Sequence, residues 1–592
     1  MADETRTAAE ALLTPESGES GETGASGESG ASGEGYARGL GGRQIQMIAI
    51  GGAIGTGLFL GAGRAIHQAG PSLILMYAVA GVVIFCIMRA LGELLTYRPV
   101  SGSFAGYARE FLGPFTGYVT GWTYWLMWVV TGMAEVTAAA TYLAYWWPWI
   151  PQWAAALAFL VLMFAANLIS VRLFGEVEFW LSMIKVTAIL GMILIGVGVL
   201  TLGVSAAGHT ASVGHLWRDG GVFPHGIGSS LLTLQIVMFA YLAVELVGVT
   251  AGEARDPRKN LPKAINTLPW RIVLFYVGAL AVILCVVSWT QFRPGVSPFV
   301  AAFAKIGIPF GAGVVNFVVL SAALSSCNSG MYSTGRMLRD LAAHGQGPRV
   351  FTRLTSRRTP AVGTLASVAA MSTGVWLNYV DPTGAFAYIT ALATVAGVWT
   401  WGVILAAHIR YRAAVRAGRA APAWFTAPGG AAASWCALAF LALVVVLIGI
   451  DPVARISLYG VPVWIAVLAG AYPVLKRRNP AAFTRHPHLA PAAPAGPEAP
   501  AGPEAGAATL GPVRGGALLF FPHADHHPGP VRRDRRPRPH RPPRRGVRDR
   551  GGPGGKRPPR AVRPDAQRRP LAHLLRVRLH RPAQAVPRAG RP

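Results

Sequence analysis

Charged side chains are scarce in this chain of 592 residues, where Asp, Glu, Lys and Arg make up 14% and hydrophobic residues 52%. Cysteine is also rare: the four cysteines stand far apart in apolar stretches without CxxC spacing. That spacing argues against a disulfide framework and against a zinc site. The chain also lacks a GK[ST] phosphate loop and a strand-helix-strand unit around a glycine run, which argues against nucleotide chemistry. We therefore expect a protein that binds no cofactor. The energy for any uphill process that it carries out would come from an ion gradient.

Apolar runs of roughly twenty residues, the length that spans a bilayer, recur along the chain. They predict an all-α integral membrane protein with about twelve transmembrane helices. The expected spans are residues 45–68, 73–96, 115–146, 152–171, 178–202, 228–252, 270–291, 308–339, 361–378, 386–408, 432–450 and 457–475.

Glycines interrupt the first of these runs at mid-membrane depth, at Gly51, Gly52, Gly55 and Gly57. Glycine has the most backbone freedom to lose in a helix, so the helix is expected to open here. In a bilayer, open backbone survives only where it is buried in protein or lines a wet cavity, which in transporters is typically the substrate site. The chain is therefore expected to be a carrier.

A second interrupted run, residues 239–248, lies in the sixth span and contains Glu245. An ionisable group inside a span is costly and is a functional candidate for that reason. Broken helices at spans one and six are the pattern of two inverted five-helix repeats with a site between them at mid-membrane. Spans eleven and twelve would be accessory.

The orientation follows from the positive-inside rule. Lysine and arginine gather in the loops after spans six, eight and ten, whereas the opposite loop at residues 146–153 has no cation and is rich in tryptophan. Both termini are therefore expected in the cytoplasm, with the chain in the plasma (inner) membrane.

The two ends differ from the apolar region in composition. Residues 1–37 are acidic and rich in Gly, Ser and Glu, which predicts disorder, and no cleavable signal peptide is expected there. Residues 481–592 are rich in Pro and Arg and carry most of the net charge of +28. Such a tail binds phosphates in general, but no folded recognition module accompanies it, so specific nucleic-acid binding is not expected. The tail also has the composition of a shifted reading frame in GC-rich DNA, and both interpretations stay open.

Several motifs resemble one known family. They are Gln46 to Phe59 (QMIAIGGAIGTGLF), Arg89 to Leu94 (RALGEL), Ser101 to Phe104 (SGSF), Gly121 to Trp125 (GWTYW) and Leu261 to Asn266 (LPKAIN). In order and over residues 38–480, the chain resembles the amino acid permeases of the amino acid-polyamine-organocation superfamily. The resemblance is to their bacterial group, which contains the asparagine and the D-serine/D-alanine/glycine permeases. It implies a leucine-transporter-type fold for residues 38–480.

The resemblance also implies where a zwitterionic substrate binds. Its carboxylate would meet the backbone amides of Thr56 and Gly57, at the positive end of the second half-helix of span one. Its ammonium would meet exposed carbonyls, those of Ala53, Ile54, Phe239 and Leu242. Phe239 and Tyr241 would be aromatic lids, although an aromatic side chain in a span is commonly a core residue.

Three ionisable residues are candidates for proton coupling or gating. Lys185 follows Glu178 by two helical turns into an apolar run, and a lysine there could gain and lose a proton during a transport cycle. The resemblance implies that this lysine takes the place of a sodium ion; the alternative is a lysine that snorkels to an interface. Glu245 would be a proton carrier, a gate or a structural carboxylate. Glu93 follows Arg89 by four residues on one helix face, as a structural pair or a gate.

The sequence therefore predicts a non-enzymatic secondary transporter that imports a neutral amino acid with a proton. The candidate substrates are asparagine and small residues such as D-serine, D-alanine and glycine. An amino acid exchanger and a non-transporting amino acid sensor are the alternatives.

Overall fold

The computed structural model describes residues 54–98, 103–169, 171–203, 205–206, 209–246, 257–307, 310–356 and 359–483. The first half of predicted span one, which includes Ala53, lies outside these residues. So do the predicted N-terminal segment 1–37 and nearly all of the predicted tail 481–592. Those predictions stay untested.

Eight helical stretches among the described residues are long and apolar enough to cross a membrane. They are Gly57–Tyr97, Pro114–Leu143, Glu178–Thr201, Pro262–Val286, Gly311–Ala343, Ala385–Arg416, Gly430–Ile450 and Ile456–Arg478. Two shorter apolar helices, Gln152–Leu168 and Gly226–Ala240, accompany them. The prediction of a helical membrane protein is confirmed. The strand pairing in the described part of the chain is one short antiparallel hairpin, β1 (Ser205–Ala206) with β2 (His209–Thr210).

The helices of the first half of the described chain are η1 (Gly57–Gly61), α2 (Ala62–Ala69), η2 (Gly70–Ser72), α3 (Leu73–Tyr97), α4 (Ser103–Tyr107), η3 (Ala108–Leu112), α5 (Pro114–Leu143), α6 (Gln152–Ile169), α7 (Val171–Thr201), η4 (Val213–Leu216), α8 (Gly226–Leu232) and α9 (Leu234–Ala240). Those of the second half are α11 (Pro257–Asn266), α12 (Leu268–Arg271), η6 (Ile272–Gly278), α13 (Ala279–Val286), η7 (Trp289–Gln291), α14 (Pro298–Ile306), α15 (Gly311–Ala343), η8 (Arg349–Thr352), α16 (Ala361–Val380), α17 (Ala385–Arg416), α18 (Gly430–Ile450), α19 (Ile456–Arg478) and η9 (Pro480–Phe483).

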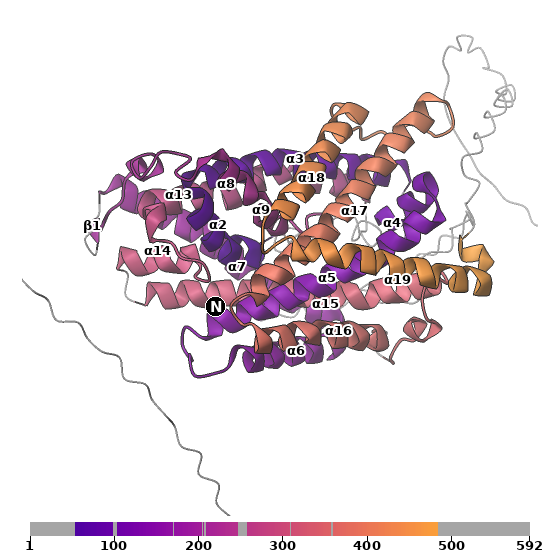
Figure 1. Ribbon diagram of the computed structural model, residues 1–592, viewed down its shortest axis with the longest axis horizontal. Coiled ribbons are helices and arrows are strands. Elements are labelled where there is room, and N and C mark those ends of the chain that lie inside the picture. Colours follow the sequence, from indigo (N-terminus) through magenta and orange to yellow (C-terminus); the bar gives the residue numbers. More distant parts are fainter. Residues whose placement is uncertain are drawn as a thin grey trace, which may run out of the picture. The chain divides into compact units, whose positions relative to one another are not determined.

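The long helices α5 and α15 pack closely where a glycine of α15 faces a tryptophan of α5. A Cβ added to Gly330 of α15 would lie 2.8 Å from the ring of Trp128 of α5, so only glycine allows this approach. Close approach through small residues is the usual way that helices associate in a membrane. In Figure 1, α5, α6, α15 and α16 lie alongside one another, and contacts join each to its neighbours.

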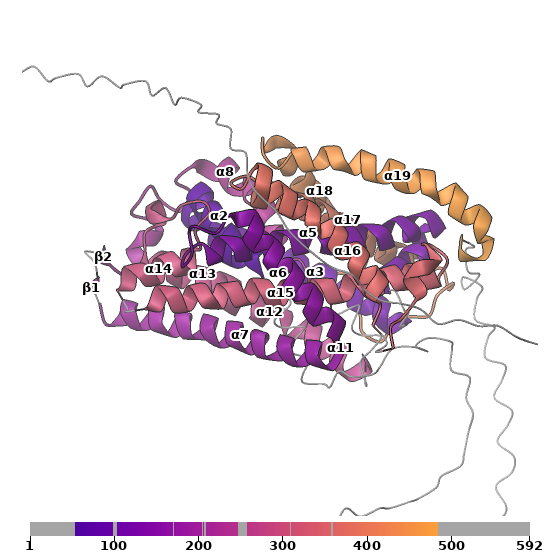
Figure 2. The ribbon, with the colours of Figure 1, turned by 90° about the horizontal axis from the view of Figure 1, so that it is seen from below.

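The last two long helices, α18 and α19, are packed less tightly than α17. Figure 2 shows α19 at the edge of the helices, beside α17 and α18. The buried residues of α19 are Ser457 and Leu468, so most of this helix faces outward. In a membrane protein such a surface faces lipid.

Candidate functional site

The second half of span one starts where the sequence predicts a break. Ile54 and Gly55 are not helical, Thr56 caps the helix, and η1 begins at Gly57 as a π-helical turn of five residues. All five residues of η1 are buried. The first amides of a helix have no partner within the helix, and π-helical turns are frequent at functional sites. The buried start of this helix therefore offers amide donors to an anion, and the backbone of Thr56 already interacts with the Glu135 carboxyl.

Span six breaks after Ala240, the last residue of α9. Residues 241–245 form consecutive turns, and Ala243 has a φ of 78° in the left-handed region. This conformation costs a residue with a Cβ about 1–2 kcal/mol, so the surrounding structure has to enforce it. The carbonyl of Ala240, which the helix no longer uses, accepts a hydrogen bond of 3.1 Å from the Tyr276 hydroxyl.

The two half-helices touch at a glycine. A Cβ on Gly57 would lie 2.5 Å from the Cα of Ala240, and one on Gly61 would lie 2.9 Å from Ile236. The backbone of span one therefore rests on the last turn of α9, and the two breaks lie side by side.

We expect Gly57→Ala to lower stability by about 1–3 kcal/mol, the usual cost of overpacking, because the added methyl meets backbone that cannot rotate away. The measurement is the thermal unfolding midpoint in detergent, together with uptake in proteoliposomes. Gly191→Ala in α7 is the matched control, since a Cβ there meets nothing within 4 Å. Equal behaviour of the two variants would contradict the close contact.

We expect Ala243→Gly to raise stability slightly, by about 0.5 kcal/mol. Glycine removes the cost of about 1–2 kcal/mol that alanine pays in the left-handed conformation. Against this, glycine loses more backbone entropy than alanine on folding, which costs about 0.5–1 kcal/mol. The free energy of unfolding in mixed micelles is the measurement, with Ala139→Gly in α5 as the control, which should destabilise. A loss in Ala243→Gly as large as in the control would argue against strain at this position.

Lys185 is fully buried, and its ammonium donates a hydrogen bond of 3.3 Å to the carbonyl of Ile54 at the break. The carboxylates of Glu178 and Glu135 interact electrostatically with this ammonium. Glu178 in turn accepts hydrogen bonds from Ser325 at 2.7 Å and Ser182 at 3.2 Å. The buried ammonium therefore has acidic partners from α5 and α7, and its position excludes a lysine that snorkels to the surface.

Glu135 lies directly against the first break. A Cβ on Gly55 would lie 2.8 Å from Glu135 Oε1 and 3.4 Å from the Ser326 hydroxyl. Thr56, Ser326 and Lys185 all interact with the Glu135 carboxyl. One polar group thus surrounds residues 54–56: Lys185 from α7, Glu135 from α5, and serines from α15.

Glu245 belongs to a different group of contacts, within the second break. Its side chain is fully buried, and Trp401 of α17 donates a hydrogen bond of 3.3 Å to it. Tyr124 and the backbone of Ala243 also lie against its carboxyl. Glu245 therefore ties the unwound backbone to α5 and α17.

The two predicted aromatic lids point in different directions. Phe239 is buried, with its ring centroid 6.3 Å from that of Phe386 of α17. Tyr241 instead packs behind the break: its hydroxyl donates to the carbonyl of Tyr77 at 2.8 Å, and its ring lies 4.7 Å from Tyr276. The carbonyl of Phe239 accepts the backbone amide of Leu242 at 3.1 Å and also that of Tyr241.

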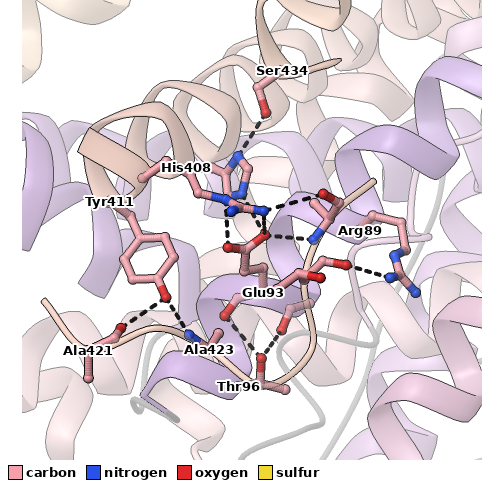
Figure 3. A network of polar contacts seen from close by, with 12 residues as sticks. Arg89, Glu93, Thr96, His408, Tyr411, Ala421, Ala423 and Ser434 are labelled. Atoms are coloured by element: carbon pink, nitrogen blue, oxygen red, sulfur yellow. Dashed lines mark hydrogen bonds and ion pairs between the residues drawn. The ribbon is translucent and has the colours of Figure 1, made fainter. Parts of the chain in front are cut away.

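Glu93 lies apart from both groups, in the network of Figure 3. Its carboxylate is buried and accepts hydrogen bonds from His408 at 3.0 Å, Arg412 at 2.9 Å and the amide of Ala427 at 2.6 Å. Arg89 interacts electrostatically with Glu93, but its hydrogen bonds go to Asn266 and to the carbonyl of Thr426. Glu93 thus joins α3 to α17 and to the loop before α18.

Several residues of these groups were not singled out from the sequence. From the sequence alone, Glu178 is used only to describe the position of Lys185, two helical turns later on the same helix, and is not predicted to belong to the site. His408 and Arg412 are four residues apart in an apolar span, which is a signal for one polar helix face. Their shared partner, Glu93, is more than 300 positions earlier in the chain and gives no local signal.

Two buried helix breaks lie side by side within a bundle of apolar spans, and a buried lysine with acidic partners lies against the first of them. This arrangement is that of an integral membrane transporter. Residues 44–484 match the family model described as amino acid permease, and the chain belongs to that family. Its members are transporters and not enzymes.

The chain is similar to bacterial proteins over most of their length. It is 47% identical over 435 residues to the uncharacterized amino acid permease YtnA of Bacillus subtilis, and the match covers 74% of this chain and 94% of that one. It is 45% identical over 434 residues to the D-serine/D-alanine/glycine transporter of Escherichia coli, covering 73% and 92%. The L-asparagine permease of Salmonella typhimurium is 43% identical over 444 residues, covering 74% and 89%.

Proposed function

We propose that the protein imports a neutral amino acid together with a proton, by alternating access around the breaks of spans one and six. The observation that carries this proposal is the hydrogen bond from the buried Lys185 ammonium to the Ile54 carbonyl. A protonated Lys185 holds the unwound end of span one, and loss of the proton weakens that hold. Proton release and movement of the half-helix are thereby coupled.

The substrate's carboxylate meets the amides of Thr56 and Gly57, and its ammonium meets the carbonyls of the two breaks, namely Ala53, Ile54, Phe239 and Leu242. The buried start of η1 supports the first assignment for Gly57. The backbone of Thr56 interacts with the Glu135 carboxyl, which the substrate carboxylate would have to displace. The ionisable groups near the first break, Lys185, Glu135 and Glu178, interact with one another. The named substrates of the relatives above, D-serine, D-alanine, glycine and L-asparagine, are all neutral.

The proposed arrangement has twelve spans, two inverted five-helix repeats, cytoplasmic termini and a place in the plasma membrane. The helices α6, α8 with α9, and α16 support the count, because they occupy predicted spans although they fall outside the eight longest apolar stretches. Glu93 is proposed as a gate residue at the cytoplasmic end of α3.

The test is uptake of radiolabelled asparagine, D-serine, D-alanine and glycine into proteoliposomes that contain the full chain, with and without an inward proton gradient. Accumulation that depends on the gradient supports symport and identifies the substrate. Flux that requires an amino acid inside the vesicles would replace symport by exchange. Binding without flux would make the protein a sensor.

A further inference from the structure

A cavity lies away from the helix breaks, between α5, α17, α18 and α19. Its volume is about 590 Å³, in the range of sites that hold small organic ligands. Its walls include Leu126 of α5, Val395 and Val403 of α17, Leu441 of α18 and Ile465 of α19. All four helices are candidate membrane spans, so the cavity lies at the level of the lipid hydrocarbon.

The cavity wall offers little to a polar ligand. Its only hydroxyl, that of Thr123, already accepts a hydrogen bond of 3.1 Å from the Trp464 indole. No charged side chain is among the described residues that line it. The buried indole N–H of Trp399, which has no hydrogen-bond partner, also lines the cavity. A polar ligand would gain few partners here for the hydration that it loses, whereas a hydrocarbon chain would lose nothing.

A cation lies one helical turn from a residue that lines the cavity. Arg455 is exposed and caps the start of α19, three residues before Leu458, which lines the cavity. Residues three apart share a helix face, so Arg455 and Leu458 lie one above the other. This places a positive charge beside an apolar cavity, which complements an amphipathic anion.

We propose that the cavity binds one acyl chain of an anionic phospholipid, whose phosphate pairs with Arg455. The bound lipid fills the space between α19 and the helices α17 and α18, and so attaches a helix that otherwise buries little surface. This site is separate from the proposed amino acid site and does not depend on it.

The test uses the full chain in detergent, titrated with phosphatidylglycerol or with phosphatidylcholine, while the thermal unfolding midpoint is recorded and bound lipid is counted by native mass spectrometry. We expect a saturable rise in the midpoint and one retained phosphatidylglycerol per chain. Gly402→Leu should abolish both, because a Cβ at Gly402 meets only Leu438 at 3.9 Å and the leucine then enters the cavity. Gly470→Leu on α19 is the matched control and should behave as wild type, since a Cβ there meets nothing within 4 Å.

Arg455→Gln should weaken phosphatidylglycerol binding about fivefold, the value of one cation near an anionic lipid surface, and should leave phosphatidylcholine binding nearly unchanged. Gly460→Leu, which also enters the cavity with room for its Cβ, replaces Gly402→Leu if that variant does not fold. A titration of the cavity variants that matches wild type would overturn the proposal. Concentration-dependent dimers that the cavity variants abolish would assign the cavity to a second copy of the chain and overturn it as well.

Discussion

Lys185→Met is expected to abolish uphill transport while leaving exchange of amino acid across the membrane. One charge crossing a potential of 100 mV supplies about 2.3 kcal/mol, so a neutral substrate carried with one proton accumulates about 50-fold. Methionine has a similar length without a charge, so the variant lacks the group that we propose carries the proton. Its accumulation ratio should fall to about 1. The measurement is the ratio of internal to external substrate in proteoliposomes at a clamped potential.

The matched control is Lys305→Met, which removes an exposed lysine of α14 and should keep the full ratio. Counterflow and a substrate-dependent rise in the unfolding midpoint show whether Lys185→Met is folded and binds substrate. Should that folded variant still accumulate substrate about 50-fold, proton coupling would have to be assigned to another residue.

Glu93→Gln is expected to lower the free energy of unfolding by about 3 kcal/mol, the lower end of the cost of breaking a buried ion pair. The lower end applies because the Arg412 side chain is 27% exposed and regains some hydration, whereas that of His408 is fully buried. Glutamine keeps one acceptor oxygen but loses the charge and the second oxygen, and its amino group cannot accept from His408, Arg412 or the Ala427 amide. Denaturant unfolding in mixed micelles measures the effect.

A double-mutant cycle separates this pair from the rest of the network. Arg412→Gln combined with Glu93→Gln should cost less than the sum of the single changes, because each variant alone leaves a partner without its counter-charge. Arg410→Gln, which removes an exposed arginine of the same helix, should be nearly neutral. Additive losses would show that Glu93 and Arg412 are not coupled.

The sequence predicted the elements whose causes are local. Apolar runs predicted the positions of helices such as α3 and α15 to within a few residues, and the glycines before Thr56 predicted the start of η1. The acidic partners of Lys185 were only partly predictable, because Glu178 is on the same helix but Glu135 comes from α5. The left-handed Ala243 had no signal at all, since alanine normally favours a helix and tertiary contacts enforce this conformation.

The three tyrosines behind the second break constrain how the protein moves. Tyr241 is hydrogen-bonded to the backbone of α3 through Tyr77, and Tyr276 of η6 is hydrogen-bonded to the last carbonyl of α9. A tilt of α9 alone would have to break both bonds and separate three packed rings. Spans two, six and seven are therefore joined at this point. They move together as one rigid unit, or these hydrogen bonds have to break before any of them moves alone.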